Sequence, residues 1–300
     1  MTTAIDRLAA TPVGFWAAQF DDLPWRDVAP VARKVDDLGL GSIWFRESGG
    51  REAMSQAALL LDATDRVVVA SGIATVWARD AVAMRNGART LSDAHPGRFV
   101  CGIGVSHPAS AAQRGAHYER PLATMAAYLD AFDAAESTAA LDVETPTVLA
   151  ALGPRMLDLA ARRTDGVHTT CVPVAHTAEA RAALSDGALV VGQAAVVSRS
   201  AADADAVARR YLARFFGRDN YRRNLHRFGI TDAAMDDPID DALVDQLVAI
   251  GGVDALAARI QAHLDAGATH VAVHLLGDDG TPAAVADALD TLAQAAERVP

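Results

Sequence analysis

The sequence predicts an α/β fold, a TIM-type (β/α)8 barrel in which eight parallel strands alternate with helices. Apolar runs with strand character alternate along the chain with alanine-rich stretches of helical character, as they do in βαβ units that build a parallel sheet. The apolar runs are continuous, which strands buried on both faces require. The length of 300 residues also suits a barrel, which takes about 250 residues plus insertions.

Eight apolar or β-branched runs supply the predicted strands. They cover residues 13–16, 42–45, 66–75, 98–103, 146–152, 166–171, 188–198 and 269–276. The helical stretches cover residues 28–38, 52–63, 81–94, 122–136, 155–163, 178–184 and 282–298. Gly39 ends the first of these helices, and the turn Pro96-Gly97 follows the third. A longer helical excursion over residues 201–266 lies between the seventh and eighth strands.

The alternative arrangement is a doubly wound open sheet. That fold usually places a glycine-rich dinucleotide-binding turn after its first strand, and residues 16–21 contain no glycine. Eight strand–helix units are the number that closes a barrel. No linker or low-complexity segment divides the chain, so we expect residues 1–300 to form one barrel domain.

The composition limits which binding partners and which cellular compartment we expect. A net charge of −11 repels phosphate backbones, so a nucleic-acid partner is not expected. No stretch reaches the roughly 18 apolar residues of a membrane span, and residues 1–10 lack the apolar core of a secretion signal. The two cysteines give no disulfide framework, which suits a reducing compartment. We therefore expect a cytoplasmic protein with no membrane partner.

Two glycine-containing segments lie where a barrel forms its active site, at the C-terminal ends of the strands. Residues 102–106, Gly-Ile-Gly-Val-Ser, follow the fourth strand, and residues 153–155, Gly-Pro-Arg, open a helix. Glycine lets backbone N–H groups approach a ligand, and the first N–H groups of a helix attract anions. Each segment alone is also typical of an ordinary turn. Their position on adjacent strands favours an anion site.

Arginine and histidine are the other groups expected at this face. His107 and His168 lie at strand ends and are candidates for chemistry, although a structural role fits the pattern equally well. No metal-binding motif is present, and no metal site is predicted. The basic, aromatic segment 211–228 has helical spacing that favours packing or a subunit contact, and its position also allows a lid. The predicted rim, which favours an anionic ligand, contains Arg46, Arg51, Arg79, Arg114 and Arg155.

Several segments resemble luciferase-like oxidoreductases. The most specific is residues 94–107, Ala-His-Pro-Gly-Arg-Phe-Val-Cys-Gly-Ile-Gly-Val-Ser-His, which resembles the fourth strand and phosphate loop of that family. Residues 40–47 resemble its second strand, residues 69–75 its third, and residues 150–157 with 161–166 its fifth and sixth units. The likeness covers most of the chain. It is greatest to the actinobacterial branch that depends on coenzyme F420, a deazaflavin.

That resemblance implies a TIM barrel, usually a homodimer, with the tricyclic ring of the coenzyme across its mouth. It implies a non-prolyl cis peptide between Gly72 and Ile73, where the third strand bulges against the ring. It also implies that the proton donor or acceptor is Glu47, His107 or His168. The coenzyme contacts expected on this basis, with the phosphate contacts last, are Glu47, Ser48, Ser71, Gly72, Ile73, Thr75, Gly104, Val105, Ser106, Gly153 and Pro154.

The chain departs from one pattern of its relatives. Related sugar-phosphate dehydrogenases carry Asp-His at the end of the second strand, where this chain has Glu47-Ser48. Serine does not act as a general base near neutral pH without an activating neighbour, so that reaction is not expected. The resemblance favours hydride transfer between a deazaflavin and a small organic substrate. The alternatives are an FMN-dependent monooxygenase of the same fold and a non-catalytic barrel that binds a flavin-like cofactor.

Overall fold

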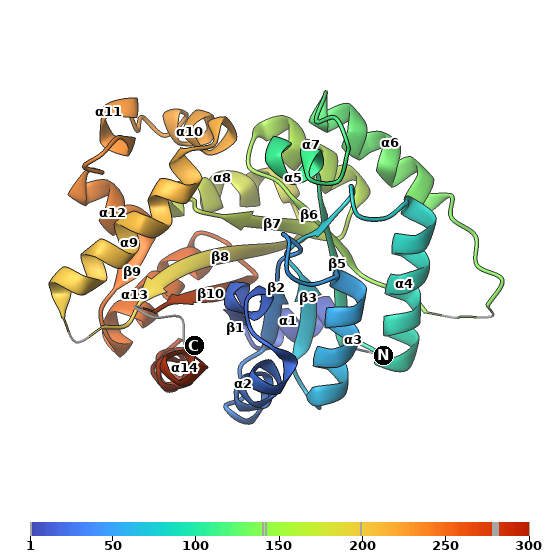
Figure 1. The fold of residues 1–300 in the computed structure, drawn as a ribbon, viewed down its shortest axis with the longest axis horizontal. Helices are drawn as coiled ribbons and strands as arrows, with labels where there is room; N and C mark the ends of the chain where they lie inside the picture. Colours follow the sequence, from blue (N-terminus) through green and yellow to red (C-terminus); the bar gives the residue numbers. More distant parts are fainter. Residues whose placement is uncertain (1, 140, 142, 199, 278–281, 300) are drawn as a thin grey trace.

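Eight parallel strands close into a barrel in the computed structural model, which describes residues 2–139, 141, 143–198, 200–277 and 282–299 (Figure 1). In the order in which they pair, the strands are β1 (Val13–Trp16), β2 (Ser42–Phe45), β3 (Val68–Ser71), β5 (Phe99–Gly104), β6 (Thr147–Ala150), β7 (Gly166–Thr170), β8 (Ala188–Val196) and β10 (His270–Leu276). The barrel closes because β10 pairs in parallel with both β8 and β1. The predicted fold class is therefore confirmed.

The third predicted strand, residues 66–75, is interrupted. It forms β3 and a second short strand, β4 (Ala74–Thr75), and both pair with β5. The peptide bond between Gly72 and Ile73, at the interruption, is cis. This confirms the expectation drawn from the family resemblance.

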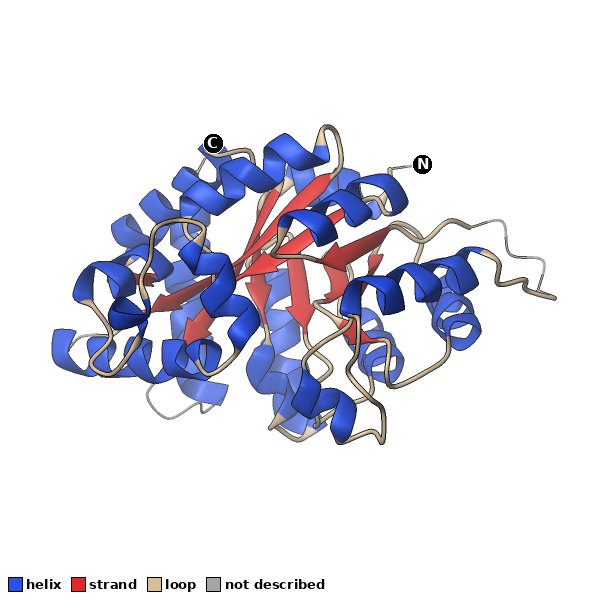
Figure 2. Cartoon of the chain, turned by 90° about the horizontal axis from the view of Figure 1, so that it is seen from above, coloured by secondary structure: helices blue, strands red, loops and turns tan. Residues whose placement is uncertain are grey.

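Helices surround the barrel, as the view from above shows (Figure 2). Their apolar faces pack on the outside of the strands in the main core, which includes Val35, Leu60 and Met84. Two short helices, η1 (Ala18–Asp21) and α5 (Pro108–Ala112), lie in the loops after β1 and β5. The longer helices of this layer are α2 (Trp25–Asp37), α3 (Ala53–Ala63), α4 (Ala81–Ala94), α6 (Pro121–Asp133), α7 (Pro154–Arg163), α8 (Val174–Leu184), α13 (Val253–Asp265) and α14 (Pro282–Ala296).

An N-terminal helix, α1 (Ala4–Ala10), is absent from the sequence-based prediction. A capping box starts it: the Thr3 hydroxyl accepts from Asp6 N–H at 3.1 Å, and the Asp6 carboxylate accepts from Thr3 N–H at 2.9 Å. Leu8 is fully buried, and its carbonyl oxygen lies 3.1 Å from Nδ1 of His270, the first residue of β10. The helix therefore covers the end of the barrel where the strands begin.

The excursion between β8 and β10 is not helical throughout. Its elements before α13 are α9 (Ala201–Phe216), α10 (Asp219–His226), α11 (Asp232–Met235), α12 (Asp241–Leu247) and a short strand, β9 (Val248–Ile250). This strand pairs in parallel with the end of β8, with Ala194 opposite Val248. Figure 1 shows these elements grouped beside β8, around a separate apolar cluster that includes Leu212, Leu225 and Val244.

None of the helices in the described parts of the chain has the length and apolar character that a membrane span needs.

Candidate active site

A cavity of about 640 Å³ opens at the end of the barrel where the strands finish. Barrel enzymes form their active sites at this face, and the cavity lies where the sequence predicts the site. Strand ends and the loops after them supply most of its lining. The helices of the excursion supply much of the remainder, including Tyr211 and Phe215 of α9 and Tyr221 of α10.

His168 of β7 lies between two tryptophan rings deep in the cavity. Its ring centroid is 4.6 Å from that of Trp16 and 5.0 Å from that of Trp44. Gly72 packs on the same group, since a Cβ there would lie 3.1 Å from Trp44 and 3.3 Å from His168 Nε2. Burial lowers the pKa of His168 to about 3, so the ring is neutral at physiological pH. Neither ring nitrogen makes a hydrogen bond of normal geometry to a described residue, although the backbone of Val190 lies close enough to offset part of the lowering of the pKa.

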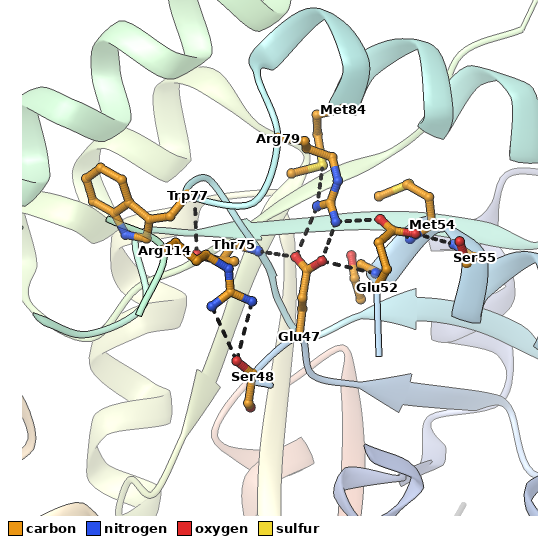
Figure 3. Close-up of polar contacts among 12 residues, drawn as sticks. Glu47, Ser48, Glu52, Met54, Ser55, Thr75, Trp77, Arg79, Met84 and Arg114 are labelled. Atoms are coloured by element: carbon orange, nitrogen blue, oxygen red, sulfur yellow. Dashed lines mark hydrogen bonds and ion pairs between the residues drawn. The ribbon is translucent and has the colours of Figure 1, made fainter. Parts of the chain in front are cut away.

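The carboxylate of Glu47 holds together the loops that follow β2 and β3 (Figure 3). It accepts hydrogen bonds from the backbone N–H groups of Ala53 at 3.1 Å and Thr75 at 2.9 Å. Both Nη atoms of Arg79 also donate to it, with Nη1 3.0 Å from Oε2. The backbone N–H of Glu47 donates to the carbonyl of Ile73 at 3.2 Å. This geometry gives Glu47 a positioning role and leaves its oxygens occupied, which disfavours the proton transfer predicted from the sequence.

The loop after β5 and the start of α7 form one end of the cavity. Ser106 has a left-handed backbone with φ of 55°, and Gly153 is the N-cap of α7, which Pro154 begins. Within the described chain, the backbone N–H groups of Ser106, His107 and Gly153 have no acceptor. Free N–H groups at such positions attract anions. This end therefore suits a phosphate, and the phosphate contacts predicted here stay a prediction.

The structure brings most of the predicted site residues to the cavity surface. They are Glu47, Ser48, Gly72, Ile73, Val105, Ser106, His107, Gly153 and His168. The other predicted residues, Ser71, Thr75, Gly104 and Pro154, are outside the cavity lining. The sequence shows where a strand ends, but it does not show which of the neighbouring side chains faces the mouth.

Two of the predicted residues outside the cavity lining, Ser71 and Gly104, have clear structural roles. The Ser71 hydroxyl donates to the carbonyl of Gly102 at 2.8 Å and accepts from its N–H at 2.9 Å, which ties β3 to β5. Gly104 leaves room for a neighbour, since a Cβ there would lie 2.8 Å from Ile73 Cγ1 and 3.2 Å from Ala150 Cβ. Glycine at 104 thus gives Ile73 room to pack, and the predicted phosphate contact of Gly104 stays a prediction.

The predicted arginine rim is largely used for internal contacts. Arg46 lines the cavity, but it pairs with Asp21 at 3.0 Å. Arg51 donates to the carbonyl of Phe20, Arg79 binds Glu47, and Arg114 donates to the carbonyl of Ser48. The last predicted member, Arg155, is not part of the cavity lining.

Three arginines outside the predicted rim line the cavity instead, and two of them, Arg214 and Arg218, lie in the basic segment 211–228, for which a lid is one of the interpretations. Arg210 and Arg214 come from α9, and Arg218 lies just beyond its end. The four-residue spacing of these arginines is a signal in the sequence, because residues four apart lie on one face of a helix. That α9 folds over the barrel mouth depends on tertiary packing and could not be derived from this spacing.

Two further histidines line the cavity on different sides. His274 of β10 packs against the ring of Tyr211, with the centroids 5.5 Å apart. Burial, and then the charges of Arg46 and Arg214, lower the pKa of His274 to about 3. Burial, and then Arg218, lower the pKa of His107 to about 4. In the described parts of the chain, no three His, Cys, Asp or Glu side chains are grouped so that they could hold a metal ion.

The fold and the site define a (β/α)8 barrel protein with a ligand cavity at its strand ends, a stacked aromatic base and one end suited to an anion. The family model described as luciferase-like monooxygenase matches residues 8–270. The chain belongs to this family, which confirms the resemblance seen in the sequence.

Curated relatives share part of the chain. A protein of Mycobacterium tuberculosis named as a coenzyme F420-dependent oxidoreductase is 29% identical over 119 residues, which cover 39% of this chain and 33% of that protein. A 5,10-methylenetetrahydromethanopterin reductase of Methanolobus tindarius is 24% identical over 162 residues, which cover 48% of this chain and 50% of that protein. The chain thus matches half or less of the length of these relatives.

Solved structures share the fold at low identity. An F420-dependent secondary alcohol dehydrogenase in complex with an F420–acetone adduct has a TM-score of 0.74 at 14% identity, covering 94% of this chain and 99% of that one. The oxygenating constituent of 3,6-diketocamphane monooxygenase from Pseudomonas putida, in complex with FMN, has a TM-score of 0.69 at 14% identity, covering 97% and 99%. Likeness at this level of identity shows the fold alone.

Proposed function

We propose that this chain is an oxidoreductase that uses coenzyme F420, a deazaflavin, to transfer hydride to or from a small organic substrate. The observation that carries the proposal is the cavity, where stacked aromatic rings lie deep and one end presents free backbone N–H groups. A planar ring system needs an apolar slot, and a phosphate needs N–H donors. The F420-dependent relative and structural neighbour support the same assignment.

The residues of the cavity fit such a coenzyme. Trp16, Ile73 and His168 would hold its ring, and the backbone N–H groups of Ser106 and Gly153 would hold its phosphate. When bound, a deazaflavin supplies a carbon that accepts or donates hydride, and the protein supplies position and electrostatics. The rings of His168 and Trp16 support the fit, because both line the cavity and lie side by side with their centroids 4.6 Å apart.

The histidines of the cavity orient ligands in this proposal. His107, His168 and His274 have pKa values lowered to about 4, 3 and 3, so each is a neutral imidazole at physiological pH. A general base works best when its pKa lies near the working pH, and these values lie well below it. We therefore assign them hydrogen bonds to coenzyme or substrate. Glu47 fixes the loop that carries Ile73.

An FMN-dependent monooxygenase is the second candidate. The FMN complex among the structural neighbours favours it, and the same residues would hold a flavin ring and its phosphate. Such an enzyme would consume oxygen and would need a reductase to supply reduced FMN. A non-catalytic barrel that binds a flavin-like cofactor is the third alternative, and detectable turnover would exclude it.

Titration of the purified protein with coenzyme F420 and, separately, with FMN tests the choice, with binding followed by fluorescence. We expect coenzyme F420 to bind at least about tenfold more tightly than FMN, a difference of about 1.4 kcal/mol. The reverse preference, together with oxygen consumption when reduced FMN is supplied, would establish the monooxygenase. Binding of neither ligand would overturn both assignments.

A further inference from the structure

The cavity carries positive charge on two sides, from different arginines. After burial, the charge of Arg218 lowers the pKa of His107, which follows β5. The charges of Arg46 and Arg214 do the same for His274 in β10. In the closed ring of barrel strands, β5 and β10 are separated by three strands in either direction, so they lie on opposite sides. His274 therefore lies across the barrel mouth from His107 and from the end that suits the coenzyme phosphate.

The charge of Arg214 is not neutralised within the described chain. Among the described residues, the carboxylates that line the cavity are those of Asp22 and Glu47, and Glu47 is bound by Arg79. Arg46 pairs with Asp21, but the ion pairs of the described residues include neither Arg210 nor Arg214.

Two like charges one turn apart on a helix repel each other. Arg210 and Arg214 have this spacing on α9 and line the same cavity. The chain is acidic overall, with 38 Asp and Glu against 27 Lys and Arg. Carboxylates are therefore plentiful in the chain, and the absence of one beside these arginines in its described parts is not a consequence of its composition. An anionic ligand between them would remove the repulsion.

The surroundings of these arginines are apolar. Val207, Tyr211 and Phe215 of α9 and Leu276 of β10 line the same part of the cavity, and the rings of Tyr211 and Phe215 are 4.9 Å apart. An inorganic ion would leave this apolar surface exposed to water. A ligand with an apolar body and one charged group would cover it.

We propose that the cavity takes a small organic anion as its substrate, with an apolar body against Tyr211 and Phe215 and a carboxylate or phosphate bound by Arg214 and Arg210. Guanidinium groups suit this task because they bind both kinds of anion through paired N–H donors. That this anion is a substrate rests on the proposed function. The anion site itself rests on the arginines and the apolar wall.

Matched probes test the site without knowledge of the natural substrate. We would titrate 2-naphthoate, 2-naphthyl phosphate and the neutral 2-naphthamide into the protein by calorimetry, with and without coenzyme F420. We expect at least one of the two anions to bind about tenfold or more tightly than the amide, because a hydrogen bond to a charged group contributes that much. Whichever anion binds more tightly identifies the charged group of the substrate class.

Three variants locate the site. Arg214→Met should remove most of the preference for the anion, and Arg214→Lys should keep part of it. Arg26→Met is the control for lost charge, since the Arg26 side chain is 82% exposed on α2 and should not change the preference. Equal affinities for anion and amide in the native protein would overturn the inference, as would a preference that survives Arg214→Met. Loss of coenzyme binding with a retained anion preference would instead overturn the proposed function.

Discussion

Both Nη atoms of Arg79 donate to the carboxylate of Glu47, in a pair whose side chains are only 10% and 2% exposed. The same carboxylate accepts a hydrogen bond from the backbone N–H of Thr75. The pair therefore connects the loop before α4, which contains Arg79, to the ends of the strands. Burial removes hydration from both charges, and such a pair contributes more to geometry than to net stability. We infer that it sets the position of the loop that carries Ile73.

Removing one partner of this pair should be costly. Arg79→Met leaves the Glu47 carboxylate buried without its counter-ion, and we expect the free energy of unfolding to fall by about 3–5 kcal/mol. Adding Glu47→Gln to this variant should restore part of the loss, because no buried unpaired charge then remains; Glu52, with which Arg79 also pairs, is 48% exposed. Urea denaturation of the two variants measures both effects.

An exposed ion pair provides the control for that experiment. Arg163 pairs with Asp130 at 2.8 Å and with Asp133 at 2.9 Å, and these aspartates are 70% and 52% exposed. Arg163→Met should therefore cost less than about 1 kcal/mol. A similar loss for Arg79→Met and Arg163→Met would contradict the role assigned to the buried pair.

His168 should be dispensable for folding and needed for the ligand. Its nitrogens make no hydrogen bond of normal geometry and only a weak contact with the backbone of Val190, so we expect His168→Leu to change the free energy of unfolding by no more than about 1.5 kcal/mol. Coenzyme binding or turnover should fall clearly. A variant that unfolds, or one that binds and turns over normally, would show that His168 is a packing residue only.

Stability should fall as the solution is acidified from neutral pH. Burial lowers the pKa of His168, His263 and His274 to about 3 and that of His270 to about 4. These values lie below the ordinary histidine value of 6.5, so the unfolded chain binds protons first as the pH drops below about 6.5. Each such histidine then lowers the free energy of unfolding by up to about 1.4 kcal/mol per pH unit.

Urea denaturation at pH 7.5 and pH 5.5 checks this dependence in a range above the titration of ordinary carboxylates. We expect a lower midpoint at pH 5.5, and a shallower dependence in His168→Leu, which has one buried imidazole fewer. A midpoint that does not change between the two pH values would show that these histidines are not held neutral in the fold.

Much of the barrel could be predicted because its strands are short, continuous apolar runs separated by stretches of helical character. What the sequence did not disclose depends on tertiary contacts. The capping box of Thr3 and Asp6 was available as a signal for α1, but nothing local indicates that Leu8 packs under the barrel. The strand β9 forms because Val248 pairs with the end of β8. This pairing joins segments that are far apart in the sequence, so local patterns do not predict it.

The sequence placed its candidate site residues at the barrel face where the cavity opens, and their roles stay predictions. Of the two glycines predicted to contact phosphate, Gly153 lines the cavity, whereas Gly104 lies outside its lining and gives room to Ile73. Glu47 was recognised at its strand end, but its partner Arg79 lies 32 residues away in the chain. The predicted rim did not include the arginines of α9, because long-range tertiary contacts place the excursion over the barrel mouth.

The most direct test of the central claim compares two glycines. Gly153 and Gly252 are the N-caps of α7 and α13, and a Cβ at either position would have no heavy atom within 4 Å. Only Gly153 lines the cavity. We predict that Gly153→Val weakens the binding of coenzyme F420 by about tenfold or more, while Gly252→Val binds it like the native protein. Both variants should lose a similar, small amount of stability, because valine is a poorer N-cap than glycine. Equal affinity in the two variants would contradict the claim that this cavity holds the coenzyme.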